Sequence, residues 1–309
     1  MINSRLKSKL PKIICVVGPT AAGKTKLGVN LAGIFNGEII SADSRQVYKH
    51  LDISTGKDKG DYIYNKKKIS YHLIDILEPS QGFSAADFQK KAFEAIDSIL
   101  KRKKLPIVVG GSPFYVYSIS EGWDFPRIKR NQKLRDQLNK IGLEELQSRL
   151  KKLDPEAYKK IDINNFRRLI RAIEIVTLTG KSFEQFKPKS KPKYQPLFLG
   201  IKFPLSELKE RIKKRLEDRL KEGIVEEAQK VIEEGKANWE DLDKMGLEPR
   251  YISYFLQGKI NKEEMKELLI RAIYQFARRQ MNWFGKDERI RWVREYKKAE
   301  KIASEFLFS

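Results

Sequence analysis

Short apolar runs of strand length alternate with longer amphipathic stretches along most of this chain. The short runs are rich in isoleucine, valine and leucine and end at glycine or polar residues, which is typical of buried strands in a parallel sheet. Such strands are predicted at residues 13–17, 38–41, 71–77, 105–109 and 197–201. Between them, apolar residues recur every three or four positions, as they do on one face of a helix. This alternation favours an α/β fold with helices covering a parallel sheet.

The pattern changes after residue 121. From 126 to 160 the chain is basic and helical in its periodicity, and a stretch rich in lysine and proline at 187–193 closes the region. We therefore predict a P-loop NTPase-like core of parallel strands and flanking helices, interrupted by an all-helical insertion. The expected boundaries are 1–121 for the first part of the core, 122–195 for the insertion and 196–309 for the second part.

The first predicted strand runs directly into the sequence G-P-T-A-A-G-K-T, which fits the P-loop pattern. In that pattern, glycines let backbone N–H groups point at phosphate oxygens, and the following helix adds its positive N-terminal dipole. Lys24 supplies a positive charge, and the Thr25 hydroxyl is a ligand for Mg²⁺. The predicted phosphate-binding residues are Gly18, Pro19, Thr20, Ala21, Ala22, Gly23, Lys24 and Thr25.

Asp43 follows the second predicted strand. The carboxyl ends of parallel strands line the ligand crevice, so Asp43 is placed either to act as a general base or to cap the following turn. On these grounds a small-molecule kinase and a transferase with a phosphate leaving group both remain open. Gly110-Gly111 follows the strand at 105–109, where a P-loop ATPase usually carries a Walker-B aspartate, and this weakens the ATPase interpretation.

The chain has a net charge of +22 and a pI near 9.8, which points to a polyanionic partner unless lysine is enriched throughout the source proteome. Its single cysteine, Cys15, excludes internal disulfides and fits a reducing cytoplasm. No apolar run approaches the ~20 residues of a membrane span. We expect a cytoplasmic protein.

The P-loop is followed by I-S-A-D-S-R-Q-V-Y-K-H-L-D-I-S-T-G-K, and together the two blocks resemble the tRNA dimethylallyltransferases, the bacterial isopentenyl-tRNA transferases. The resemblance continues in order through Y-H-L-I-D, F-S-A-A-D-F, L-P-I-V-V-G-G-S, R-R-L-I-R-A-I-E and Q-F-A-R-R-Q-M-N-W-F, and covers nearly the whole chain. It implies transfer of a dimethylallyl group from dimethylallyl diphosphate to N6 of adenosine 37, next to the tRNA anticodon, with release of pyrophosphate.

The same resemblance implies roles for particular residues, with Mg²⁺ on Thr25 and a monomeric enzyme acting on the anticodon stem-loop. The implied catalytic residues are Asp43, Lys24, Ser112 and Arg211, and Arg215 joins the diphosphate site. The implied tRNA-binding residues are Asp43, Ser44, Arg45, Gln46, Ser112, Arg135, Arg167, Arg168 and Arg171.

Some positions depart from the family pattern. Pro113 is unusual beside Ser112, Leu247 stands where the family has tyrosine, and Ile273-Tyr274 replaces Thr-Arg. Arg219 occupies a place that is usually apolar. These departures keep open the alternative of a tRNA-binding relative without activity.

Overall fold

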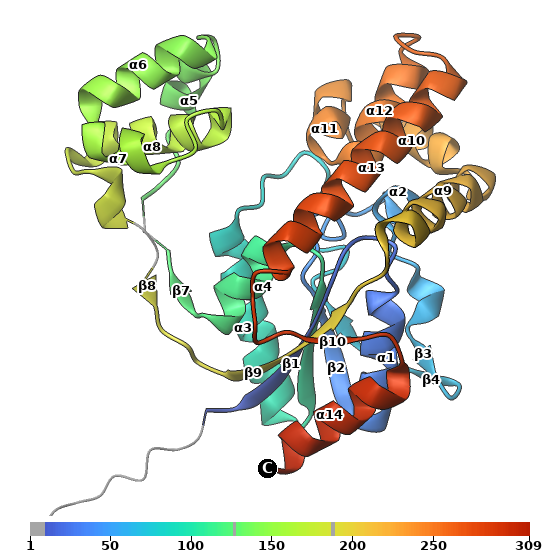
Figure 1. The fold of residues 1–309 in the computed structure, drawn as a ribbon. Coiled ribbons are helices and arrows are strands. Elements are labelled where there is room, and N and C mark those ends of the chain that lie inside the picture. The colour runs from blue at the N-terminus through green and yellow to red at the C-terminus, as the bar shows by residue number, and fades with distance from the viewer. Residues whose placement is uncertain (1–9, 126–127, 187–188) are drawn as a thin grey trace, which may run out of the picture. The chain divides into compact units, whose positions relative to one another are not determined.

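A six-stranded sheet lies at the centre of the larger part of the protein. The computed structural model describes residues 10–125, 128–186 and 189–309 (Figure 1). The strands, in their order across the sheet, are β10 (Arg291–Val293), β9 (Gln195–Ile201), β1 (Lys12–Val17), β6 (Leu105–Gly110), β2 (Gly37–Ser41) and β5 (Tyr71–His72). All the neighbouring strands pair in parallel, so the predicted α/β fold is confirmed. The strand β10 is not predicted from the sequence, because its three residues are too few to show a period.

The prediction of a strand over 71–77 is wrong beyond His72. Leu73 and Asp75 adopt φ of +64° and +56°, in the left-handed region that side chains avoid, so the chain cannot stay extended. Ile76 and Leu77 instead donate their backbone N–H groups to the carbonyl of Val47. After this bend the segment runs on beside the residues that follow β2, and Leu77 pairs with Tyr48 in a parallel bridge.

Lys57 anchors this turned segment. Although lysine is normally exposed, the Lys57 side chain is completely buried. Its ammonium group donates hydrogen bonds to the Tyr48 carbonyl (2.5 Å), Asp52 Oδ1 (2.8 Å) and Asp75 Oδ1 (2.6 Å). A buried ammonium needs such partners, and here they join the loop after β2 and the start of α2 to the segment after β5.

Helices cover both faces of the sheet (Figure 1). On one face, α1 (Lys24–Ile34) and α14 (Tyr296–Phe308) share an apolar cluster with alternate residues of the strands. On the other face lie α3 (Ala85–Lys101) and α4 (Pro113–Ser120). A capping box begins α3, because the Ser84 and Asp87 side chains each bond the other's backbone N–H.

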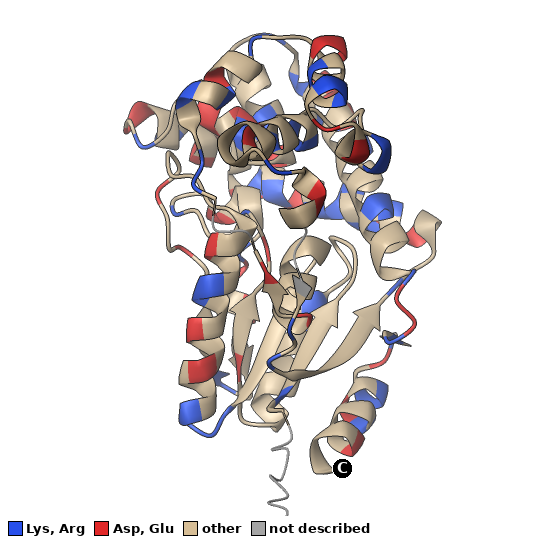
Figure 2. Cartoon of the chain, turned by 90° about the vertical axis from the view of Figure 1, so that its left-hand side faces the viewer, with Lys and Arg blue, Asp and Glu red and all other residues tan. Residues whose placement is uncertain are grey.

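A layer of helices lies beyond the carboxyl ends of the strands (Figure 1). It has its own apolar cluster, to which Leu208, Ile212 and Leu216 contribute from one face of α9. Charged residues of both signs lie mainly on these and the other helices and loops, and the strands carry few (Figure 2). The helices of this layer are α2 (Asp52–Thr55), α9 (Leu205–Glu222), α10 (Ile224–Glu233), α11 (Trp239–Lys244), α12 (Leu247–Leu256) and α13 (Lys262–Phe284).

Residues 123–191 form a second compact unit. A two-stranded antiparallel pair, β7 (Trp123–Asp124) with β8 (Lys189–Ser190), stands at its two ends. Its helices are α5 (Gln132–Leu138), α6 (Leu143–Leu153), α7 (Pro155–Lys160), α8 (Phe166–Thr179) and the 3₁₀ turn Phe183–Phe186. Leu146, Leu150 and Leu169 belong to an apolar cluster made within this unit alone.

The remaining short elements, between α2 and β5, are a 3₁₀ turn (Lys59–Asp61) and a hairpin of β3 (Ile63–Tyr64) and β4 (Lys67–Lys68). In the described part of the chain, no helix is both long and apolar enough to cross a membrane.

Glu38, in the first half of β2, is buried with an exposed fraction of 3%. Its carboxylate pairs with three basic groups, those of Lys104 (2.9 Å), Arg102 (2.7 Å) and His72 (2.7 Å). Burial alone would raise the pKa of Glu38, but the hydrogen bonds from these partners lower it to about 2. The carboxylate thus ties the edge strand β5 and the turn before β6 to β2.

We predict that Glu38→Gln lowers the free energy of unfolding by an amount that depends on pH. Because the folded pKa lies below the unfolded value, the stabilisation is present above pH ~4.5 and is lost as the pH falls toward 2, and it amounts to about 3 kcal/mol. Urea unfolding at pH 6 and pH 3.5 measures it. The gap between wild type and Glu38→Gln should narrow at the lower pH, and the exposed Glu210→Gln serves as the control. An equal gap at both values would contradict the assignment.

Candidate active site at the carboxyl edge of the sheet

The loop between β1 and α1 has the backbone of a phosphate cradle. Gly18 has φ of +142°, and a Cβ there would lie 2.5 Å from the carbonyl oxygen of Ile201, so only glycine fits. Ala21 and Gly23 also adopt positive φ, +60° and +84°, which turns the loop tightly before α1 begins. The predicted P-loop is therefore formed, and the N-terminus of an eleven-residue helix adjoins it.

Lys24 is held in place by the loop itself. Its Nζ donates a 2.6 Å hydrogen bond to the carbonyl of Pro19. Burial and the nearby Arg215 lower the pKa of Lys24 to about 8, against a smaller opposing effect of Asp43. The lysine therefore lies in a region where positive charge is already concentrated, as expected of a site that binds an anion.

Both predicted arginines of α9 contact the P-loop. Arg211 Nε donates to the Ala21 carbonyl (2.9 Å), and Arg215 Nη1 donates to the Thr20 hydroxyl (3.1 Å). The two arginines are four residues apart and so lie on one side of the helix. The structure brings them together with Lys24 around one loop, although they lie nearly 190 residues away in the sequence.

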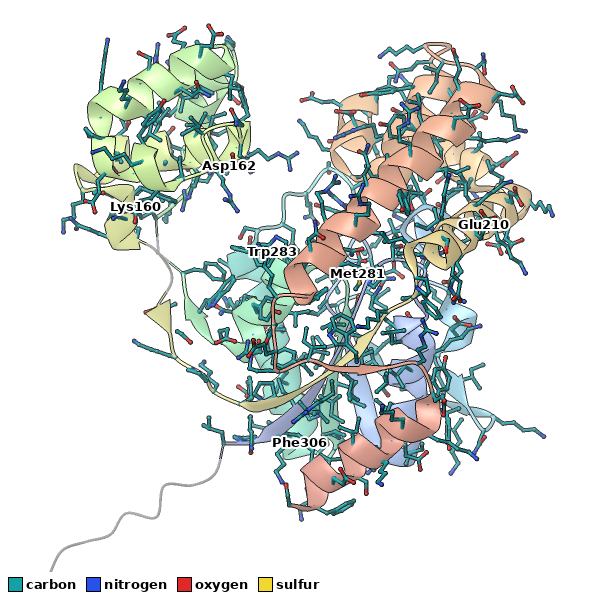
Figure 3. All side chains as sticks on the ribbon, in the orientation of Figure 1. Lys160, Asp162, Glu210, Met281, Trp283 and Phe306 are labelled. Carbon is teal, nitrogen blue, oxygen red and sulfur yellow. The ribbon has the colours of Figure 1, made fainter. Side chains whose placement is uncertain are left out.

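Gln280 of α13 joins the P-loop to the Gly-Gly loop after β6. Its Oε1 accepts the Thr20 N–H (2.9 Å) and its Nε2 donates to the Gly111 carbonyl (2.6 Å). Gln280 is buried, whereas Trp283, one turn further along α13, is exposed (Figure 3). Gln280 is not among the predicted site residues, and the only signal for it in the sequence is its place in the block Q-F-A-R-R-Q. The side chain fixes the separation of the two loops.

Asp43 lies in a tight turn after β2. Its Oδ1 accepts the N–H of Arg45 (2.8 Å), and Ser44 is the half-buried residue between them. One carboxylate oxygen thus stabilises the turn, as the capping alternative required. Asp43 also opposes the lowering of the Lys24 pKa, so its carboxylate lies within electrostatic range of the phosphate cradle.

The neighbouring β6 loop approaches β2 closely. A Cβ on Gly110 would lie 2.2 Å from the Ala42 carbonyl oxygen. Ser112 then precedes α4, and its hydroxyl makes no capping bond to that helix. Pro113, the departure noted in the sequence, is the first residue of α4, where its missing N–H costs nothing.

Two residues predicted to bind tRNA make bonds within the protein. Arg45 donates to the Lys244 carbonyl (2.8 Å). The Gln46 amide accepts from the Ser41 hydroxyl (2.7 Å) and donates to the Gly56 carbonyl (2.8 Å). These bonds order the loop after β2, and a role in binding RNA stays a prediction for both residues.

The four arginines singled out in the insertion fall into two classes. Arg135 and Arg171 both pair with the fully buried Glu174, each at 2.6 Å. Burial would raise the pKa of Glu174, but these guanidinium groups lower it to about 2. Arg167 and Arg168 are exposed in the first turn of α8. Arg135 and Arg171 therefore have a structural role, whichever ligand the unit binds.

The residues present suit a Mg²⁺ ion held chiefly by a substrate. Among the described residues there is no group of three histidine, cysteine or acidic side chains that could hold a metal. Mg²⁺ commonly takes few protein ligands and is otherwise bound by phosphates and water. Thr25 in the first turn of α1 matches such a ligand.

Comparison with known proteins gives consistent results. The family model "IPP transferase" matches residues 46–287. The tRNA dimethylallyltransferase 2 of Shewanella sediminis is 42% identical over 91% of this chain and 92% of its own length. The tRNA isopentenylpyrophosphate transferase of Bacillus halodurans, a solved structure, is 33% identical, with a TM-score of 0.69 over 96% of this chain and 95% of that one. A eukaryotic dimethylallyltransferase described as acting on tRNA gives a TM-score of 0.75 and 29% identity, over 89% and 70% of the two chains.

We predict that anion binding by this site weakens as Lys24 loses its proton. With a pKa of about 8, Lys24 is mostly charged at pH 7 and mostly neutral at pH 9, which should lower the affinity for inorganic pyrophosphate about tenfold. Calorimetric titration at both pH values measures this. Lys24→Met is the matched control, because the titration of pyrophosphate itself affects both proteins alike. Parallel pH dependences of the two proteins would contradict the role of Lys24.

Proposed function

This chain belongs to the IPP transferase family, and on that premise we propose that it is a tRNA dimethylallyltransferase, which transfers a dimethylallyl group from dimethylallyl diphosphate to tRNA. One observation carries the proposal. A phosphate cradle, two arginines and a carboxylate are gathered at a single edge of the sheet. A reaction that expels a diphosphate and removes a proton from an amine needs this set of groups together.

In the proposed reaction, N6 of adenosine 37 attacks the allylic carbon of the donor. The new N–C bond forms, the C–O bond to the diphosphate breaks, and the proton on N6 passes to Asp43. The adenine amine is a weak nucleophile because its lone pair is delocalised into the ring, so a base that orients it helps. The base must leave the stack of the anticodon loop, which costs less in a single strand than in a duplex.

The leaving group carries the growing negative charge. Lys24, Arg211 and Arg215 are placed to stabilise that charge, since all three have a cationic group against the P-loop. Ser112 lies in the Gly-Gly loop that Gln280 holds, and we assign its hydroxyl to the same reaction region. When bound, Mg²⁺ on Thr25 would add a further charge against the phosphates.

We propose that one copy of the chain suffices and that the reaction takes place in the cytoplasm. The substrate RNA would be recognised through the anticodon stem-loop. The loop from Asp43 to Gln46 would face the target base, while the exposed arginines of α8 would contact RNA phosphates.

One assay tests the proposal against its rivals. The protein is incubated with bulk tRNA and labelled dimethylallyl diphosphate, and ATP hydrolysis is followed in parallel. Label in tRNA without any need for ATP supports the transferase. Hydrolysis of ATP without transfer would indicate a P-loop kinase or ATPase, and retention of tRNA without transfer would indicate a binding protein.

We predict that Asp43→Asn lowers single-turnover transfer by about 10²–10⁴-fold, or roughly 3–5 kcal/mol, because the base is lost. Asparagine keeps an Oδ1 that can accept the N–H of Arg45, so the turn should survive. The melting temperature and the affinity for pyrophosphate should therefore stay close to those of the wild type. If the variant transfers at a near wild-type rate with both substrates saturating, Asp43 is not the base, and its role is only to stabilise the turn.

We predict that Arg167→Ala together with Arg168→Ala weakens tRNA binding and leaves pyrophosphate affinity unchanged. If each arginine neutralises one phosphate, the slope of log affinity against log salt should fall by about 1.4 in magnitude. Arg135→Ala is the contrasting variant, because it removes a partner of the buried Glu174 and should lower the melting temperature. An unchanged salt slope in the double variant would remove α8 from the RNA-binding surface.

A further inference from the structure

A second arginine lies beside Arg215. Arg219 is one turn further along α9, and both guanidinium groups point to the same place over Gly56. A Cβ built on Gly56 would be 2.2 Å from Arg215 Nη2 and 1.9 Å from Arg219 Nη2, so these two nitrogens are at most about 4 Å apart. Two like charges this close repel each other unless an anion lies between them.

The acidic side chains of the protein only partly balance these two charges. Arg219 is buried, with an exposed fraction of 5%, and its Nη2 has no hydrogen-bond partner among the described residues. Nη1 lies 3.4 Å from Glu248 Oε1, longer than the ~2.8 Å of a good charge-assisted hydrogen bond. Glu248 is the one carboxylate printed within ion-pair distance of Arg219 among the described residues, and that contact is long. A buried arginine with an unused donor is costly in a folded protein, and such an atom calls for an explanation.

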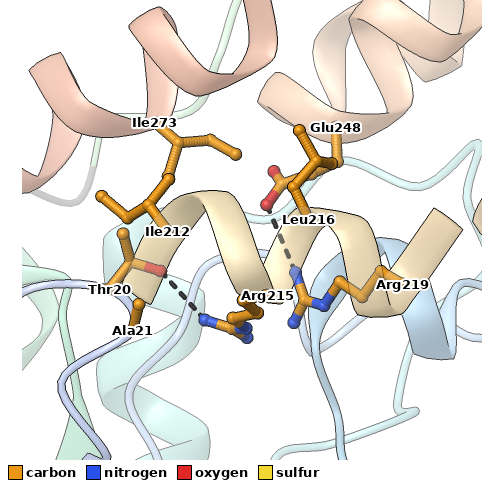
Figure 4. Close-up of a pocket in the computed structure, with 8 residues that line it drawn as sticks. All are labelled: Thr20, Ala21, Ile212, Arg215, Leu216, Arg219, Glu248 and Ile273. Carbon is orange, nitrogen blue, oxygen red and sulfur yellow. Dashed lines mark hydrogen bonds and ion pairs between the residues drawn. The ribbon is translucent and has the colours of Figure 1, made fainter. Parts of the chain in front are cut away.

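These groups line a pocket that opens on the P-loop (Figure 4). Thr20 and Ala21 form one side of the pocket, and the dashed bond in the figure joins Arg215 to Thr20. Three apolar side chains, those of Ile212, Leu216 and Ile273, also line the pocket. Arg219 and Ile273 are both positions at which this chain departs from the pattern of the family it resembles. The two departures therefore lie at one site, next to the phosphate cradle.

We propose that Arg219 is a further phosphate-binding residue, which together with Arg215 holds a phosphate group of the diphosphate substrate and of the pyrophosphate product. The proposal rests on the proposed function, because it assigns the anion to the leaving group of that reaction. Guanidinium groups suit it, since each can present two N–H donors to two oxygens of one phosphate. Such an anion would pair the unused Nη2 and offset the repulsion between the arginines.

The charges around Arg219 agree with this assignment. Burial and Arg215 lower the pKa of Arg219, against the opposing effects of Glu248, Asp58 and Glu222. The guanidinium remains charged at neutral pH, because arginine does not lose its proton there. The surroundings therefore disfavour the positive charge in the absence of a bound anion.

The test compares pyrophosphate binding by wild type, Arg219→Met and a matched control, Lys214→Met, which removes an exposed cation from the same helix. Loss of charge-assisted hydrogen bonds should weaken binding about 10- to 100-fold in Arg219→Met. Lys214→Met should bind like the wild type. Equal affinities for all three proteins would overturn the inference. A wild type that does not bind pyrophosphate at all would instead count against the proposed function.

A second variant separates ligand binding from a purely structural ion pair. Glu248→Gln removes the competing carboxylate and keeps Arg219, so the proposal expects pyrophosphate to bind as tightly as in the wild type or more tightly. If Arg219 served only to join α9 to α12, Glu248→Gln would disturb the site and weaken binding. This result decides the question even if Arg219→Met fails to fold.

The source of the phosphate is tested in the same proteins. Arg219→Met should bind tRNA with wild-type affinity, as measured by filter retention without the prenyl donor. Loss of tRNA binding with intact pyrophosphate binding would assign Arg219 to a phosphate of the RNA backbone and would overturn the assignment to the diphosphate.

Discussion

Repulsion between cations gathered around one loop is the constraint on which the arrangement of this site depends. Lys24, Arg211, Arg215 and Arg219 all lie near the P-loop, and such a cluster is stable only if other parts of the fold hold it together. Backbone carbonyls of Pro19 and Ala21 each accept a bond from one of these cations. The apolar face of α9 also holds the arginines in place, because Leu208, Ile212 and Leu216 pack into the helical layer.

The two ends of β2 show how stability and chemistry are kept apart. Glu38, in the first half of the strand, is buried among three basic partners and keeps a depressed pKa. Asp43, just past the other end, is only half-buried and has one oxygen in a turn. A carboxylate that fixes the sheet and one that lies at the ligand edge are thus only five positions apart in the sequence.

The sequence was most informative where the signal is local. The P-loop and four of the five predicted strands followed from motif and period, because each is specified by residues close together in the chain. The bonds of Gln280 to Thr20 and Gly111 join segments 169 or more residues apart, and no period marks them. The burial of Lys57 and of Glu174 was also missed, since charged residues are normally exposed and only tertiary partners reverse this.

The strand pair β7 and β8 has a consequence for how this fold can vary between relatives. Trp123 pairs with Ser190 and Asp124 with Lys189, so the chain leaves the core and returns to it at neighbouring points. The described residues between those points form an apolar cluster of their own. An insertion closed in this way can change without a change in the core. Its helices can be lengthened, shortened or replaced over generations while the register of the sheet stays as it is.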